Sequence, residues 1–250
     1  MMIREVRWTL QHASRKFRHE MMTWFNYLRA WKGFWLSYRR YKQISPEHIK
    51  TAMEYLHPCF GDDIAETPVE PVYFYQDAWA FGKIVQRRPE LHIDVGSHHK
   101  FVSLLCQVIP LTMVDIRPLS LPLDTLEHKR GSILNLPFED DSVISVSSLC
   151  VVEHVGLGRY GDSLDPYGSE KAIAELKRIV KPGGDLYLSL PLDDENRTYF
   201  NAHRAFKEEY ILSLFEPFQT LESRYIYSSE FCHQAKSGFG IGCYHLRCPQ

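Results

Sequence analysis

The sequence predicts an α/β protein in which a mostly parallel sheet carries helices on both faces and a helical extension precedes the sheet. Short apolar runs alternate with segments of helical spacing over residues 89–250. One of these helical segments ends in Lys181-Pro-Gly-Gly184, which is a helix stop signal. Such alternation is typical of parallel sheets covered on both sides. We therefore expect a basic, aromatic helical extension over residues 1–88 and an α/β domain over residues 89–250.

The composition is that of a folded globular protein and excludes several other classes of protein. The 250 residues are 44% hydrophobic and 24% charged, and the net charge at pH 7 is −2. These values are ordinary for a globular domain and exclude a disordered, collagen-like or multi-span membrane protein. The six cysteines form no C-x-x-C pair, and no apolar leader follows the start of the chain. A reducing cytoplasm is therefore the expected compartment.

The extension combines positive charge with tryptophan. Residues 1–50 hold 11 Lys and Arg against 3 Asp and Glu, whereas the remaining residues hold 18 against 28. One helix face is formed by Met21, Trp24, Leu28, Trp31, Trp35 and Tyr38, and Trp8 lies further upstream. This face packs on the protein itself or on a second subunit, or it lies in a membrane interface with basic residues at the headgroups. We expect a homo-oligomer contact or a peripheral membrane contact through residues 1–42, with the subunit contact favoured.

Residues 43–88 hold two predicted helices. The first starts at Ser45-Pro46-Glu47, because serine is a frequent N-cap and proline fits the first turn, and it ends before Pro58. The second covers Tyr73–Arg88.

The domain follows with strands and helices in alternation. Five apolar runs predict strands, namely Leu91–Asp94, Leu111–Asp115, Arg130–Leu134, Val143–Leu149 and Asp185–Leu190. Helices are expected over Lys100–Val108, Ser169–Val180 and Glu208–Phe215. The last two strand-like runs are Thr220–Tyr227 and Phe239–Leu246.

Polar residues follow the first two strands, where an open parallel sheet binds its ligands. Asp94, Gly96 and Ser97 end the first strand, and Asp115 ends the second. Gly96 permits a tight turn and a close approach to the backbone. An acid in the place of Asp115 can accept both ribose hydroxyls of a nucleoside cofactor. Because no G-x-G-x-x-G pattern follows, a pyrophosphate-bearing nicotinamide cofactor is disfavoured.

Ordered motifs of the domain carry a family resemblance. Leu136-Pro-Phe-Glu-Asp-Asp-Ser142 precedes the fourth strand, Glu153-His-Val155 follows it, and Lys181-Pro-Gly-Gly184 precedes the fifth. Residues 90–192 resemble the class I S-adenosylmethionine-dependent methyltransferases, in particular the subgroup with L-P-F-x-D-x-S, E-H-V and K-P-G-G elements. The resemblance implies a Rossmann-like sheet of seven strands, an antiparallel strand at Phe239–Leu246, and S-adenosyl-L-methionine as the cofactor.

The resemblance also implies roles for single residues. The cofactor-binding residues would be Asp94, Gly96 and Ser97 at the methionine end, Asp115 at the ribose, Ile116, Ser132 and Ile133 at the adenine, and Cys150 near the sulfonium. His98 and Lys100 stand where the family has further glycines, and Ser132 stands where an acid is frequent. These departures keep a catalytically inactive, methyltransferase-like binding module as the alternative.

The implied activity is methyl transfer to a small-molecule or glycan-like acceptor, at oxygen. Such a transfer requires alignment of the acceptor with the methyl group, and an oxygen acceptor also needs a base. His154, after the fourth strand, is the first candidate for this base, although it could equally brace its loop; His203 is the second. A glycine-rich loop with Arg159, Tyr160 and Asp162 could close over the acceptor.

Other ligand classes find little support in the sequence. The domain is acidic and has no N/D-P-P-Y motif after the fourth strand, so a nucleic-acid substrate is not expected. The histidines and cysteines over residues 232–248 do not have the spacing of a zinc finger, so no metal site is expected.

Overall fold

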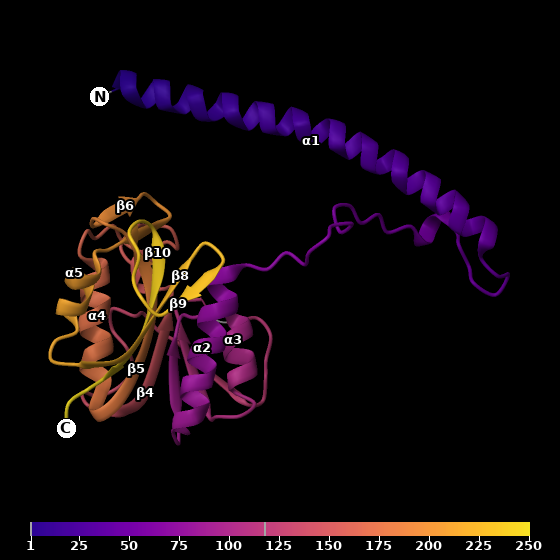
Figure 1. Ribbon diagram of the computed structural model, residues 1–250. Coiled ribbons are helices and arrows are strands. Elements are labelled where there is room, and N and C mark those ends of the chain that lie inside the picture. Colours follow the sequence, from indigo (N-terminus) through magenta and orange to yellow (C-terminus); the bar gives the residue numbers. More distant parts are fainter. Residues whose placement is uncertain (1, 118) are drawn as a thin grey trace. The chain divides into compact units, whose positions relative to one another are not determined.

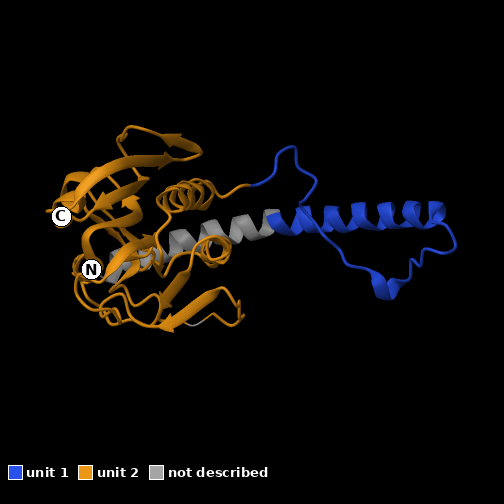
Figure 2. Ribbon diagram, turned by 90° about the horizontal axis from the view of Figure 1, so that it is seen from below, with its two compact units in different colours: residues 1–68 blue, residues 69–250 orange. Residues whose placement is uncertain are grey.

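The protein consists of two compact units, Met1–Pro68 and Val69–Gln250 (Figure 2). The structure, a computed structural model, describes the backbone of residues 2–117 and 119–250 and the side chains of residues 23–117 and 119–250. The unit boundary lies earlier than the division between residues 88 and 89 expected from the sequence. The reason is that helix α2 (Pro71–Arg87) packs on the sheet of the second unit, where Trp79, Ala80 and Ile84 are buried in the core.

The second unit is built on a sheet of eight strands in the order β3-β2-β1-β4-β5-β10-β8-β9. The strands are β1 (His92–Val95), β2 (Leu111–Asp115), β3 (Leu126–Arg130), β4 (Val143–Leu149), β5 (Val180–Leu192), β8 (Gln219–Tyr227), β9 (Glu230–Cys232) and β10 (Gly240–Arg247). The strands β1 to β5 pair in parallel, and β10 lies antiparallel between β5 and β8. The mostly parallel sheet and the antiparallel last strand are confirmed. The expected count of seven is wrong, because β9 adds an eighth strand as a short hairpin on β8.

Helices cover both faces of this sheet, as the sequence predicted (Figure 1). On one face, α2 and α3 (His99–Leu105) bury apolar side chains in a cluster with β2. On the other face, α4 (Gly168–Ile179) and α5 (Glu208–Leu214) do the same against β4 and β5. In α4 the buried residues Ala172, Ile173, Leu176 and Ile179 recur at helical spacing, so one stripe faces the sheet.

Two predicted elements differ from the structure: one strand lies earlier in the sequence, and one helix does not form. The third strand is β3, Leu126–Arg130, rather than Arg130–Leu134, because the edge strand has the charged sequence LEHKR and no apolar run marks it. The helix predicted from Ser45 is wrong: only a short 3-10 turn, η1 (Met53–Tyr55), follows α1 (Met2–Ile44). The hydroxyl of Ser45 donates to the carbonyl of Tyr41 at 2.8 Å, so this serine contacts the end of α1 and does not start a new helix.

One buried carboxylate connects elements from both ends of the second unit. Asp185 of β5 is fully buried and accepts hydrogen bonds from Arg87 at the end of α2, at 2.7 Å. Its other oxygen lies 2.9 Å from His245 Nε2 and 2.7 Å from an Arg247 nitrogen, both on β10. A buried charge is tolerated only when it is paired, and these three partners supply that pairing.

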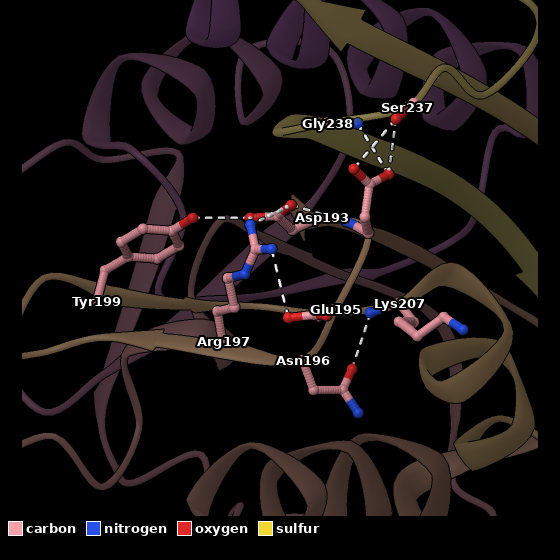
Figure 3. Close-up of polar contacts among 9 residues, drawn as sticks. Asp193, Glu195, Asn196, Arg197, Tyr199, Lys207, Ser237 and Gly238 are labelled. Atoms are coloured by element: carbon pink, nitrogen blue, oxygen red, sulfur yellow. Dashed lines mark hydrogen bonds and ion pairs between the residues drawn. The ribbon is translucent and has the colours of Figure 1, made fainter.

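The segment after β5 is held by two aspartates (Figure 3). Asp193 accepts from Arg197 at 2.9 Å and from the Tyr199 hydroxyl at 2.7 Å. Asp194 accepts from Ser237 and from the backbone of Gly238. These contacts fix the small two-stranded ribbon of β6 (Arg197–Tyr199) and β7 (His203–Ala205), whose turn contains Ala202.

The first unit packs part of its aromatic face on itself. Phe60 contacts the rings of Tyr27, Trp31 and Phe34 of α1, with centroid distances of 5.8, 5.1 and 6.1 Å. The hydroxyl of Tyr38 donates to the carbonyl of Thr51 at 2.8 Å. The side chains of Trp8 and Met21, which the sequence analysis placed in this segment, lie outside the described residues. Among the helices that the structure describes, none is long and apolar enough to cross a membrane.

Candidate functional site

A cavity of about 530 Å³ opens at the carboxyl ends of the central parallel strands. The strand order reverses between β1 and β4, and ligands of open α/β sheets bind at this switch point. Most residues that the sequence predicted for the site line this cavity, namely Gly96, Ser97, Asp115, Ile116, Ser132, Ile133, Cys150 and His154. Asp94 and His203 are not among the lining residues.

Asp94 shapes the turn after β1. Its side chain is fully buried and accepts hydrogen bonds from the backbone of Ser97 at 3.0 Å and from the Ser147 hydroxyl. Burial raises the pKa of Asp94 to about 6, although the hydrogen bonds from Ser147 and Ser97 act in the opposite direction. Ser97 in turn accepts from the backbone of Leu149 at 3.0 Å, which ties the turn to the end of β4. Asp94 therefore positions the loop that lines the cavity.

Gly96 is required by the path of this turn. Its φ is +73°, and a Cβ atom there would lie 3.0 Å from Val151 Cγ1. The next residue but one, His98, caps α3 by accepting from the backbone of Lys100 at 3.3 Å, and its ring lies 4.9 Å from that of Tyr73. The loop therefore turns tightly without the further glycines of the family pattern.

Asp115 stands at the end of β2 and faces the cavity. One carboxylate oxygen accepts from the backbone of Arg117 at 2.7 Å. The guanidinium of Arg117 lies over the ring of Tyr160, 4.5 Å from its centroid. On the neighbouring strand end, Ile133 is nearly buried, and Ser132 accepts from the backbone of Leu134 at 3.2 Å.

Cys150 forms the wall after β4 as an unreactive thiol. Its Sγ donates to Gln76 Oε1 at 3.1 Å, and burial, with Glu153 nearby, raises the pKa of Cys150 well above its usual range. Gln76 is fully buried on α2 and also accepts from Ser189 at 2.7 Å. Sequence reasoning missed Gln76 and Tyr73, because α2 was assigned to the extension; a glutamine on the apolar face of that helix was the available signal.

His154 lies on the short 3-10 turn η2 (Val152–His154) and presents a defined tautomer. Its Nδ1 lies 2.7 Å from the carbonyl of Ala202. A carbonyl only accepts, so Nδ1 donates and Nε2 carries the lone pair. Burial lowers the pKa of His154 to about 4, although the hydrogen bond to Ala202 acts in the opposite direction. The ring is therefore neutral near pH 7 and holds an unprotonated nitrogen beside the cavity.

Glu153 is the third residue that sequence reasoning missed, although it belongs to the E-H-V motif. It is buried, and its Oε1 lies 3.7 Å from His154 Nε2. Its Oε2 is buried and has no hydrogen-bond partner among the residues that the structure describes. Burial raises the pKa of Glu153 to about 8, so this carboxyl is mostly protonated near pH 7. Near pH 7 the proton of this pair therefore lies on Glu153, and the ring of His154 is neutral.

The glycine-rich loop after η2 is folded around Asp162. This carboxylate accepts from the backbone of Gly156 at 2.6 Å and of Tyr160 at 3.2 Å. Gly156 has a φ of +82°, and a Cβ atom there would lie 2.2 Å from the carbonyl oxygen of Asp165. Tyr160 and Asp162 line the cavity, whereas Arg159 donates to the carbonyl of Ala202 at 2.9 Å.

His203 lies on β7, and its ring packs between other aromatic rings. Tyr199 and Phe239 lie 5.0 and 5.4 Å from it. Burial and the charge of Arg159 lower the pKa of His203. Across the residues that the structure describes, no group of three or more His, Cys, Asp or Glu side chains could hold a metal ion.

Comparisons with known proteins agree with this architecture. One sequence family, described as "Caenorhabditis protein of unknown function, DUF268", matches residues 138–237. A search of curated proteins finds no match.

Three solved structures illustrate the likeness in fold. The first is the 1,6-didemethyltoxoflavin-N1-methyltransferase of Burkholderia thailandensis, solved with bound 1,6-didemethyltoxoflavin and S-adenosylhomocysteine. It is 15% identical in sequence, the match covers 70% of this chain and 79% of that chain, and the TM-score is 0.52. A putative sarcosine dimethylglycine methyltransferase from Galdieria sulphuraria is 16% identical, with coverage of 70% and 86% and a TM-score of 0.52. The [4+2]-cyclase SpnF is 14% identical, with coverage of 69% and 81% and a TM-score of 0.51. The second unit thus has the Rossmann-like fold of class I methyltransferases, and the predicted fold class is confirmed.

Proposed function

We propose that the protein is an S-adenosyl-L-methionine-dependent methyltransferase that acts on a small-molecule or glycan-like acceptor, at oxygen. The observation that carries this proposal is the cavity at the switch point, lined from the ends of four parallel strands. Its volume of about 530 Å³ lies in the range of small-molecule sites. The Burkholderia enzyme of the same fold binds S-adenosylhomocysteine, which supports this choice of cofactor. The six free thiols are consistent with a reducing cytoplasm as the compartment.

The residues present fit the cofactor. Asp115 offers a carboxylate at the end of β2, where ribose hydroxyls would donate to it. The turn at Gly96 exposes backbone beside Cys150, and Ile133 supplies an apolar wall for the adenine. When bound, the cofactor would supply a methyl group on its sulfonium sulfur and would leave as the thioether S-adenosylhomocysteine.

His154 acts on the acceptor in this proposal. Its neutral Nε2 would take the proton of an acceptor hydroxyl and so make the oxygen a better nucleophile. Nε2 lies 3.7 Å from Oε1 of Glu153, a carboxyl that is mostly protonated near pH 7. His203 stays the second candidate for the base, and a brace for the Ala202 loop stays the alternative role of His154.

Calorimetry with S-adenosylhomocysteine tests the function. We expect binding by the full chain and a loss of at least about tenfold in affinity for Asp115→Ala, because charge-assisted hydrogen bonds are removed. The exposed Asp124→Ala is the matched control and should bind as the unaltered protein does. Absence of binding at millimolar ligand contradicts an enzyme and leaves the methyltransferase-like binding module, which the His98 and Lys100 positions favour.

The acceptor is identified by mass spectrometry. The protein is incubated with S-adenosyl-L-methionine and a metabolite or glycan extract, and products are searched for the gain of one methyl group. Methylation at oxygen rather than nitrogen is then read from fragment ions. A product methylated at nitrogen would refute the oxygen assignment while it keeps the methyltransferase assignment.

A further inference from the structure

The described part of α1 has an aromatic side and a basic side that adjoin each other. Successive residues of a helix are rotated by about 100°. On this rotation, Trp24, Trp35, Leu28, Arg39 and Lys32 follow one another around the helix in that order and form one continuous strip, the docking strip. Between residues 23 and 44 the chain contains five Lys and Arg and no Asp or Glu. The strip therefore joins apolar rings to positive charge along a single line.

Part of the aromatic side is covered within the first unit, but four of the five residues of the docking strip are exposed, and Trp35 is half-buried against Trp31. Phe60 packs on Tyr27, Trp31 and Phe34, which lie on the far flank of the aromatic side. Trp24 and Leu28 stay 65% and 56% exposed. Exposed apolar patches rimmed by polar residues mark interaction surfaces.

We propose that the docking strip binds the surface of an anionic lipid bilayer. Trp24 and Leu28 enter the boundary between headgroups and acyl chains, while Lys32 and Arg39 contact the anionic headgroups. Tryptophan suits this boundary because its ring is apolar and its N–H can be hydrated. This inference concerns the first unit and does not depend on the proposed methyl transfer.

Charge favours a bilayer over a second copy of the chain. Two docking strips in contact would bring four basic residues, Lys32 and Arg39 from each copy, into one interface without an acidic partner from residues 23–44. Like charges repel when they lie within the screening length, which is about 8 Å at physiological salt. An anionic surface attracts each of the same residues instead. A nucleic acid would also attract them, but it offers no apolar layer for the leucine and tryptophan of the strip.

The test is co-sedimentation of the full chain with vesicles. We expect binding to phosphatidylcholine vesicles that contain phosphatidylserine, little binding to pure phosphatidylcholine, and weaker binding at high salt. Tryptophan fluorescence should shift to shorter wavelength on binding. Trp24→Ser with Leu28→Ser should reduce binding by about tenfold or more, because the apolar anchor is removed. Lys32→Glu with Arg39→Glu should remove the preference for phosphatidylserine.

A matched pair in the second unit is the control. Leu104 and Val108 are exposed to a similar extent, 66% and 55%, at the same spacing, and neither lines the cavity. Leu104→Ser with Val108→Ser should leave vesicle binding unchanged, and circular dichroism should confirm the helix content of every variant. Equal or absent binding to both vesicle types overturns the proposal. The proposal is also overturned if Trp24→Ser with Leu28→Ser leaves vesicle binding unchanged but abolishes a stable dimer or binding to RNA.

Discussion

Replacing His154 by asparagine separates a base from a brace, because asparagine keeps one function of the ring and removes the other. The carbonyl of Ala202 lies 2.7 Å from Nδ1 of His154. The side-chain N–H₂ of asparagine would occupy the place of Nδ1 and could still donate to this carbonyl. The lone pair of Nε2 has no equivalent in asparagine. If His154 only holds the loop, His154→Asn should therefore keep most of the activity.

The size of the effect follows from the neighbours of the ring. A positioned base contributes about a hundredfold to ten-thousandfold to turnover. Glu153 Oε1 lies 3.7 Å from Nε2, but this carboxyl is mostly protonated near pH 7 and gives an imidazolium little charge stabilisation. Burial lowers the pKa of His154 to about 4, so the ring is neutral and Nε2 carries a lone pair near pH 7. We expect His154→Asn to lower kcat by about a hundredfold or more, with unchanged affinity for S-adenosylhomocysteine.

The assay measures methyl transfer at saturating cofactor, together with calorimetric binding of S-adenosylhomocysteine. The exposed His233→Asn is the matched control and should retain both activity and affinity. Unchanged turnover of His154→Asn would remove this residue from the chemistry, and His203 would then be tested in the same way. A parallel loss of turnover and cofactor affinity would mean that the loop needs the whole imidazole ring and not only its hydrogen bond to Ala202, and so that His154 has a structural role.

Three further predictions concern stability. The unaltered protein should lose stability between about pH 5 and pH 8, because the folded state keeps the proton of Glu153 up to a pKa of about 8 while the unfolded chain releases it near pH 4. Glu153→Gln cannot titrate, so it should remove this loss and be more stable than the unaltered protein at about pH 8, relative to about pH 5, by up to about 4 kcal/mol. Urea unfolding at both pH values checks this, and an unchanged pH dependence would contradict it. Gly156→Ala should destabilise the unit by more than about 1 kcal/mol, because its φ of +82° is strained for alanine and the new Cβ meets the Asp165 carbonyl; thermal unfolding measures this, and an unchanged Tm would show that the loop adapts. Asp185→Ala should cost about 1–3 kcal/mol, because His245 and the partly exposed Arg87 and Arg247 lose the buried carboxylate that they share; a loss below about 1 kcal/mol would mean that water replaces the carboxylate.

Sequence patterns identified the sheet where burial imposed a pattern on the chain. The strands β1, β2 and β4 are buried on both faces, so each is an apolar run, and the antiparallel β10 followed from the family resemblance. The edge strand β3 gave no such signal, because exposed edges carry charge. The eighth strand, β9, has only three residues, too few for a periodicity.

The site was predictable where it is made of backbone turns and strand ends, and not where it depends on packing between distant elements. The order of the motifs brings Gly96, Asp115 and Ser132 to one edge of a parallel sheet. The contact of Gln76 with Cys150 joins two elements far apart in the sequence, and no local sequence pattern predicts it. The environment of Glu153 arises in the same way, because burial is a property of the folded chain.

The carboxylate of Asp185 determines where the second unit can be cut. A fragment that begins at residue 89, at the boundary suggested by the sequence, would retain the sheet but lack Arg87. A fragment that stops before β10 would lack Arg247 and His245. Either truncation leaves the same buried negative charge short of its partners, so the folding unit begins before β1 and includes β10. The second unit therefore reaches from Val69 to Gln250, with α2 as an integral part of its fold.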